Sequence, residues 1–152
     1  MKSKLIVLLV TTVFISCYNA SDTKQSENNV KDSATTECYS SINDKDSIAL
    51  NITTIGKNVT GELSYNIQEK DKNVGAIEGE MIGDTIFAEY AFMSEGTQSI
   101  REVAFLKNNN TLVEGFGPVE DVNGKVVFKN RSALVFNNAN LLNKVDCPPN
   151  QR

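Results

Sequence analysis

The sequence predicts an all-β protein, in which about eight short antiparallel strands follow one another as a meander and close into an up-and-down barrel. Three observations support this fold. Apolar and polar residues alternate along most of the chain beyond residue 37, turn-forming Gly, Asn and Asp residues interrupt the alternation at short intervals, and no convincing long helical period occurs. A two-sheet β-sandwich satisfies the same alternation and is the alternative fold.

The first predicted hairpin joins residues 48–53 to residues 61–67 through a turn at Gly56-Lys57. A two-residue turn brings apolar residues into facing pairs: Ile52 with Gly61, Leu50 with Leu63, and Ile48 with Tyr65. An odd-length turn about Asp71 carries the same face into the next strand, with Tyr65 opposite Ile77 and Leu63 opposite Gly79.

The stretch 77–116 predicts four more strands that keep one apolar face in step. A two-residue turn at Gly83-Asp84 gives three facing pairs: Met81 with Ile86, Gly79 with Ala88, and Ile77 with Tyr90. Turns at Glu95-Gly96 and Asn108-Asn109 extend that face through three more: Ala88 with Val103, Ile86 with Phe105, and Phe105 with Leu112. The predicted strand register therefore keeps the apolar residues on one face across three consecutive turns.

The C-terminal part of the chain contains clear turn signals. Gly117-Pro118 interrupts the strand ladder, because proline has no amide donor. The segment Val122-Asn123-Gly124-Lys125 is the strongest hairpin signal in the chain, and it leads into a further strand at residues 126–128. We expect the tail, residues 137–145, to hold one short helix through Leu141 and Leu142.

Closure into a barrel follows from the one-sided polarity of these strands. One face is apolar, and no other predicted element is large enough to cover it, so the sheet must curl upon itself. Glycines at Gly61, Gly75 and Gly79 fit bends in a curling sheet. The expected barrel resembles that of the lipocalins.

The first residues read as an export signal. Lys2 and Lys4 precede an apolar run over residues 5–15, which is too short for a membrane-spanning helix of about 20 residues. The run ends in Phe14-Ile15-Ser16-Cys17, which resembles the lipobox of bacterial lipoproteins. The resemblance implies that residues 1–16 are a signal peptide and that Cys17 is acylated, for example with palmitate. An ordinary secretory signal is the alternative.

A polar tether and one folded domain follow Cys17. Residues 17–36 are rich in Asn, Ser, Thr, Asp, Lys and Gln, a composition that is typical of disordered segments. We expect residues 37–152 to form the barrel domain. Tyr18 follows the cysteine, and by resemblance to lipoprotein sorting in enteric bacteria this favours the outer membrane, facing the periplasm or the exterior. Asp32-Ser33-Ala34 resembles the O-glycosylation acceptor of the Bacteroidota, a phylum that an Asn- and Lys-rich composition suits, but chance is the favoured explanation of so short a match.

The three cysteines fit this organisation. An exported protein with an odd number of cysteines leaves one thiol to explain, and acylation of Cys17 removes it. We therefore predict a disulfide between Cys38 and Cys147, worth roughly 4–5 kcal/mol on the loop-entropy model. Two buried free thiols are the alternative.

Composition limits the function. The chain carries 15 basic and 19 acidic residues, and without Lys2 and Lys4 the count is 13 against 19, a net charge of −6. No basic patch occurs, which argues against nucleic acid as a partner and leaves the lipid on Cys17 as the membrane attachment. The chain has no His and no cysteine expected to be free, so we predict no enzyme, no cofactor and no metal site.

Four glutamates fall on the polar face of the central strands: Glu78, Glu80, Glu89 and Glu102. The register places Glu78 opposite Glu89, a proximity that an acid–base pair of a hydrolase would use. A solvated outer face is the favoured interpretation, because outward positions lack enclosure. Calcium is a third possibility, but the loop Asp121-Val122-Asn123-Gly124 lacks the ligand pattern.

Two charged residues face inward, and they are the candidate binding residues. Arg101 and Glu114 share the apolar face, one diagonal step apart, so we expect them to form an ion pair that the hydroxyls of Tyr90 and Tyr65 complete. Such a pair either closes one end of the barrel or anchors a ligand there. The loop Ser94-Glu95-Gly96-Thr97 is either a plain turn or a binding rim.

Three functions are compatible with this sequence. The first is a non-catalytic binding module for a small or lipidic ligand, by analogy with lipocalins. The second is a protein-interaction role in the cell envelope, such as an assembly factor or an inhibitor of a wall-degrading enzyme. A carboxylate-based hydrolase is third, because the usual catalytic side chains are missing.

Overall fold

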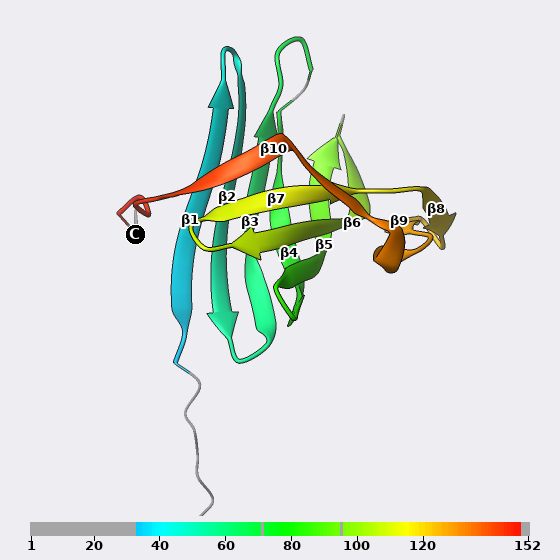
Figure 1. Ribbon diagram of the computed structural model, residues 1–152. Coiled ribbons are helices and arrows are strands. Elements are labelled where there is room, and N and C mark those ends of the chain that lie inside the picture. The colour runs from blue at the N-terminus through cyan, green and yellow to red at the C-terminus, as the bar shows by residue number, and fades with distance from the viewer. Residues whose placement is uncertain (1–32, 71, 95, 150–152) are drawn as a thin grey trace, which may run out of the picture. The chain divides into compact units, whose positions relative to one another are not determined.

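Eight antiparallel strands close into a barrel (Figure 1). The structure, a computed structural model, describes residues 33–70, 72–94 and 96–149. The barrel strands are β1 (Thr35–Asn43), β2 (Asp46–Ile55), β3 (Asn58–Asn66), β4 (Asn73–Ile82), β5 (Thr85–Ser94), β6 (Thr97–Asn108), β7 (Thr111–Phe116) and β10 (Val135–Val145). Each pairs with the next, and β10 pairs with both β7 and β1. The predicted all-β barrel is confirmed, and it is not a sandwich.

Several predictions from the sequence concern residues outside the described ranges. These are the signal peptide over residues 1–16, acylation of Cys17, the first part of the tether over residues 17–32, and the turn residues Asp71 and Glu95. The first strand, β1, begins at Thr35, slightly before the expected start of the barrel domain at residue 37.

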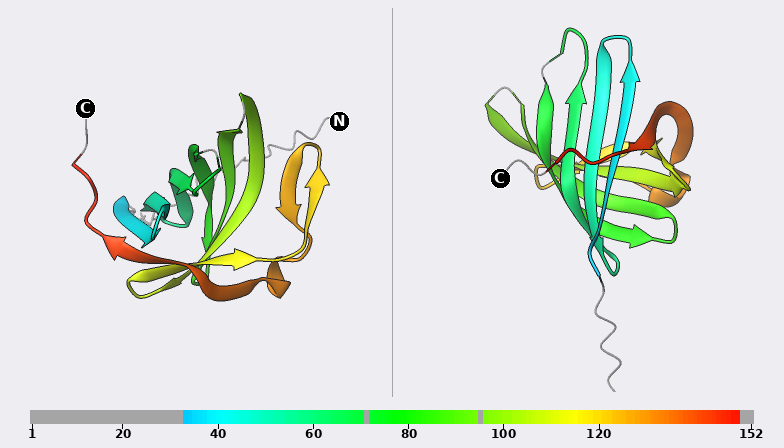
Figure 2. Two further views of the ribbon diagram at one scale, coloured as in Figure 1. Left: turned by 90° about the horizontal axis from the view of Figure 1, so that it is seen from above. Right: turned by 90° about the vertical axis from the view of Figure 1, so that its left-hand side faces the viewer.

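Two further strands lie outside the barrel. β8 (Val119–Val122) and β9 (Lys125–Phe128) form a hairpin, followed by the short 3-10 helix η1 (Arg131–Ala133). The turn of this hairpin has positive φ at Asn123 and Gly124, as the sequence predicts for this dipeptide. β9 pairs in parallel with the first half of β6, so the hairpin stands beside the barrel wall (Figure 2).

The helix predicted over residues 137–145 is wrong. The segment is strand β10, which fills the gap between β1 and β7 and satisfies the backbone groups of both edges. Leu142 is fully buried and faces Leu112 in the barrel core. An irregularity between Phe136 and Leu141 interrupts the pairing with β7, and it also breaks the alternation that would have identified a strand.

Most of the predicted strand register is confirmed, in the hairpins β2–β3, β4–β5 and β5–β6. Two registers are wrong. Tyr65 lies opposite Asn73 and not Ile77, because the β3–β4 turn is centred near Glu69, where φ is positive. Phe105 lies opposite Glu114 and not Leu112, because the next turn is centred one residue later than expected. Both shifts are even, so every side chain still points to its predicted face.

Inward-facing side chains fill the middle of the barrel. The largest fully buried ones are Tyr39, Tyr90, Phe105, Leu50, Ile52, Leu63, Ile77, Ile86, Leu112, Leu142 and Val59. Close strand contact accompanies the curl at all three predicted glycines, and a Cβ atom at Gly61 would lie 2.0 Å from a carbonyl oxygen of β2. A Cβ atom at Gly75 or Gly79 would lie 2.0 Å from a carbonyl oxygen of β5, so a side chain at either position would push the strands apart.

The predicted disulfide between Cys38 and Cys147 is confirmed. The two residues are 109 positions apart in the chain, and their Cα atoms are 5.1 Å apart. The bond ties the segment after β10 to β1, where Cys38 lies opposite Val145. It therefore reinforces the pair of strands that closes the barrel.

Candidate functional site

The four predicted binding residues come from four strands and point into the same end of the barrel. Tyr65 lies near the end of β3, Tyr90 on β5, Arg101 near the start of β6, and Glu114 on β7. This is the end at which the β3–β4 and β5–β6 turns lie. Tyr90 is directly opposite Arg101 in the β5–β6 ladder.

The predicted ion pair between Arg101 and Glu114 does not form, which corrects the expectation. The Glu114 side chain is buried, with 5% of the residue exposed, and its carboxylate accepts hydrogen bonds from the Tyr65 hydroxyl and from Asn140 Nδ2, each at 2.6 Å. The shifted β6–β7 register explains the difference. It places Glu114 opposite Phe105, four residues along β6 from Arg101.

Arg101 rests instead on aromatic rings. Its guanidinium carbon lies 4.9 Å from the ring centroid of Tyr65, 5.4 Å from that of Tyr90 and 5.6 Å from that of Phe92. Tyr90 and Phe92 stack on each other with centroids 4.6 Å apart. The negative faces of such rings attract a cation, so the charge is stabilised without a carboxylate in contact.

Burial keeps both tyrosines of this cluster protonated. Burial raises the pKa of Tyr65 far above its usual value, the charge and hydrogen bond of Glu114 raise it further, and Arg101 opposes them. Burial likewise raises the pKa of Tyr90 to about 12, against the opposing charge of Arg101. Tyr65 is therefore the hydrogen donor to Glu114 over the physiological pH range.

Several polar atoms of this region make no hydrogen bond within the described ranges of the chain. At this end of the barrel they are the Tyr90 hydroxyl, Arg101 Nε and Asn73 Oδ1, all buried. Asn73 lies opposite Tyr65 in the β3–β4 ladder. Native proteins satisfy most buried polar atoms, so these three mark a place where polar contacts are missing.

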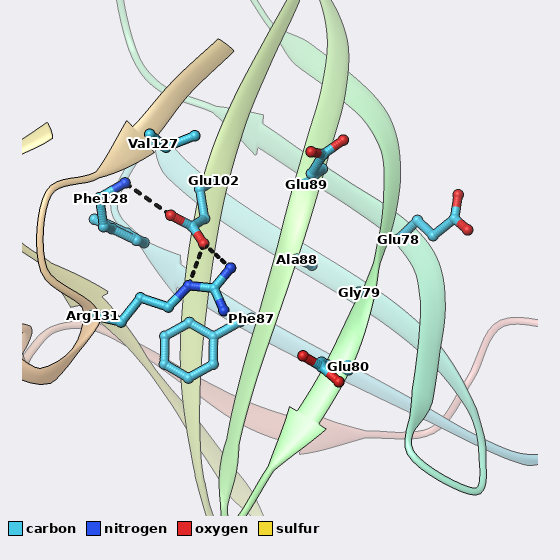
Figure 3. Close-up of a pocket in the computed structure, with 10 residues that line it drawn as sticks. All are labelled: Glu78, Gly79, Glu80, Phe87, Ala88, Glu89, Glu102, Val127, Phe128 and Arg131. Carbon is cyan, nitrogen blue, oxygen red and sulfur yellow. Dashed lines mark hydrogen bonds and ion pairs between the residues drawn. The ribbon is translucent and has the colours of Figure 1, made fainter. Parts of the chain in front are cut away.

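A pocket of about 530 Å³ lies on the other side of the barrel wall, between strands β4, β5 and β6 and the segment that contains β9 and η1 (Figure 3). Its lining combines carboxylates with apolar and aromatic groups: Glu78, Gly79, Glu80, Phe87, Ala88, Glu89, Glu102, Val127, Phe128 and Arg131. The four glutamates that the sequence places on the outer face thus border one pocket.

Glu102 holds the far wall of this outer pocket in place. Its side chain is only 6% exposed, because β9 and η1 cover it. Its carboxylate accepts a hydrogen bond from the Phe128 amide at 2.8 Å and one from Arg131 Nε at 2.6 Å (Figure 3). The Arg131 guanidinium also lies 4.8 Å from the ring centroid of Phe87. The solvated position expected for Glu102 is therefore wrong.

The other three glutamates differ in their partners. The register confirms that Glu78 lies opposite Glu89, and Glu89 in turn lies opposite Glu102. Lys125 Nζ pairs with both oxygens of Glu89, at 2.6 and 2.8 Å. Within the described part of the chain, no basic side chain pairs with Glu78 or Glu80. The pocket thus has two carboxylates without a cation beside an apolar surface.

Sequence reasoning missed four residues of the outer pocket: Phe87, Val127, Phe128 and Arg131. The Asn123-Gly124 turn identified the hairpin that carries two of them. Its position against the barrel depends on the parallel pairing of β9 with β6, which no local pattern signals. Within the described ranges, no three His, Cys, Asp or Glu side chains are grouped so as to hold a metal ion.

The fold and the pocket define this protein as a closed eight-stranded β-barrel protein. It has an external hairpin, and an acidic, partly aromatic pocket lies beneath that hairpin. No protein-family model matches the chain, no curated protein is similar to it, and no solved structure matches its fold. In the part of the chain that the structure describes, no helix is long and apolar enough to cross a membrane.

Proposed function

We propose that this chain is a non-catalytic binding module of the bacterial cell envelope, anchored by lipid on Cys17, which binds a basic segment of an envelope protein in its outer pocket. The observation that carries the proposal is the position of that pocket, on the outside of the barrel and beneath the hairpin. Binding a small ligand within the barrel, as lipocalins do, was the first expectation from sequence.

The packing of the barrel favours the outer face. The middle of the barrel is occupied by side chains, including Tyr39, Phe105 and Leu142, that have 0–1% of their surface exposed. The outer pocket has a volume of about 530 Å³, within the range of roughly 300–1,000 Å³ that ligand sites in proteins occupy.

The lining of the pocket indicates the chemistry of the occupant. Glu78 and Glu80 offer carboxylates to a cation, while Phe87 and Phe128 offer apolar surface beside them. Lysine and arginine side chains combine an apolar stem with a cationic head, so they match both features. The net negative charge of the chain would also speed the approach of a basic partner.

Attachment to the envelope is supported by the first seventeen residues. The segment Phe14-Ile15-Ser16-Cys17 resembles a lipobox, and the polar segment after it would give the barrel freedom to reach a partner. A hydrolase is less well supported. Glu89 and Glu102 form ion pairs with Lys125 and Arg131, and Glu78 and Glu80 are exposed, so these four carboxylates do not form an enclosed acid–base pair.

The test is binding of a fluorescently labelled lysine hexapeptide to the full chain in a non-ionic detergent, measured by fluorescence anisotropy. We expect replacement of the two unpaired carboxylates, Glu78→Gln with Glu80→Gln, to weaken binding about tenfold, and added salt to weaken the wild type. The matched control is Glu69→Gln with Asp84→Asn, which removes the same charge at two exposed positions outside the lining. Equal weakening in both double variants would mean non-specific attraction and would overturn the proposal.

A further inference from the structure

A second binding site is indicated inside the barrel end, independent of the outer pocket. Tyr90 is fully buried, and its hydroxyl has no hydrogen-bond partner. Arg101 Nε, on the residue directly opposite, is buried and unpartnered as well. A hydroxyl can donate and a guanidinium N–H always donates, so two buried donors on facing residues lack an acceptor within the described residues.

Arg101 brings a positive charge to this position. Among the described residues no carboxylate pairs with Arg101, and Glu114, on the neighbouring β7, receives its hydrogen bonds from Tyr65 and Asn140. The ring centroids of Tyr65, Tyr90 and Phe92 lie 4.9–5.6 Å from the guanidinium carbon, so apolar surface covers part of the charged group. In such surroundings the attraction between a cation and an anion is stronger than it is in water.

The end of the barrel gives access to this position. Arg101 itself is partly exposed, as are Phe92, Ser99 and Asn73 around it. The amide of Asn73, whose Oδ1 is the third unpartnered atom, adds a polar group at the same end. The donor atoms themselves have almost no exposed surface, so an anion reaches them only when the partly exposed side chains at this end move aside.

We propose that this end of the barrel binds a small oxyanion, a carboxylate or phosphate group, whose oxygens accept hydrogen bonds from the Tyr90 hydroxyl and the Arg101 guanidinium. The oxyanion is either a free ion or the charged end of a larger molecule. A planar guanidinium with an adjacent hydroxyl suits oxyanions, because the N–H groups and the O–H group address separate oxygens.

Thermal unfolding of the full chain in non-ionic detergent tests the site. The probes are sodium phosphate and sodium acetate, compared with sodium chloride at the same ionic strength and pH. We expect at least one oxyanion to raise the Tm of the wild type above its value in chloride, by mass action on the folded state. Isothermal titration with that anion then gives the affinity.

The decisive variant is Tyr90→Phe. Because the hydroxyl lacks a partner, its removal should leave stability in chloride unchanged or increased, so the variant should fold. Oxyanion affinity should fall about 10- to 100-fold, as expected for the loss of one hydrogen bond to a charged group. Arg101→Gln should abolish the response.

The matched control is Tyr39→Phe. Tyr39 is also buried with an unpartnered hydroxyl, but Arg101 does not lie over its ring. This variant should retain the full oxyanion response, as should Glu78→Gln with Glu80→Gln on the outer face. The proposal is overturned if neither oxyanion raises the Tm of the wild type, or if Tyr90→Phe responds as strongly as the wild type does.

Discussion

Along β5 and β6, neighbouring residues point to opposite faces of the barrel wall, and the two faces stabilise charge in different ways. Inside, Arg101 lies against aromatic rings, and the Glu114 carboxylate receives hydrogen bonds from two neutral donors. Outside, Glu89 and Glu102 pair with the cations Lys125 and Arg131.

The difference separates what stabilises the barrel from what shapes its surface. The inner Glu114 carboxylate is buried and Arg101 is largely covered by aromatic rings, so the loss of one partner leaves a charge poorly compensated. The outer cations are about half exposed, Lys125 at 43% and Arg131 at 50% of their side chains, and the segment that carries them lies outside the barrel, so these pairs contribute little to the stability of the barrel. Inner substitutions that remove a hydrogen bond from a buried charge should therefore lower the stability of the whole barrel, and outer substitutions should affect the hairpin.

The largest expected effect is on the inner face. Tyr65→Phe removes one of the two hydrogen bonds to the buried Glu114 carboxylate, and we expect it to lower the free energy of unfolding by about 2 kcal/mol. Urea denaturation followed by circular dichroism measures this. Tyr39→Phe is the control, since its hydroxyl has no partner to lose, and it should change stability little. Equal losses in the two variants would show that Glu114 does not depend on Tyr65.

The sequence was sufficient to predict the faces of the strands but not every pairing. Alternation has a period of two, so the register errors at the β3–β4 and β6–β7 turns, which are even, left each side chain on its predicted face. The register does, however, determine which inward-facing side chains contact one another. A shift of two residues was enough to replace the expected Arg101–Glu114 pair with contacts from Tyr65 and Asn140 to Glu114.

The outer pocket could not be predicted, for a different reason. Its far wall depends on the parallel pairing of β9 with β6, a contact between distant parts of the chain. The closing strand β10 likewise depends on two edges that only the assembled barrel offers. Local patterns identified Asn123-Gly124 as a turn, and they could not indicate where its hairpin packs.

The second effect, on the outer face, should be smaller and local. Glu102→Ala removes the acceptor for the Phe128 amide and for Arg131, so β9 should separate from β6 more often. We expect hydrogen exchange at the Phe128 amide to become about tenfold faster, while the global free energy of unfolding changes by less than about 1 kcal/mol.

Hydrogen exchange monitored by NMR measures both quantities, because the slowest amides of the core report global unfolding. Glu120→Ala, at an exposed position on β8, is the control and should leave exchange at Phe128 unchanged. A global loss in Glu102→Ala as large as that of Tyr65→Phe would remove the distinction between the two faces.

The smallest expected effect concerns Glu37, a largely buried carboxylate on β1 that forms ion pairs with lysines, as Glu89 does on the outer face. Its side chain is 11% exposed and pairs with Lys107 and Lys144. Burial would raise the pKa of Glu37, but the hydrogen bonds and charges of the two lysines outweigh it and hold the pKa below its usual value of 4.5.

A lowered pKa in the folded state means that the unfolded state binds the proton more tightly. The stabilisation is therefore complete above about pH 4.5 and is lost as the pH falls through the lower folded pKa. Because other carboxylates titrate in the same range, the informative quantity is the difference in unfolding free energy between wild type and Glu37→Gln. This difference should be largest near neutral pH and should shrink as the pH falls below 4.5, in urea titrations at a series of pH values. A constant difference would mean that the two lysines do not stabilise the charged form, and that Glu37 acts through packing.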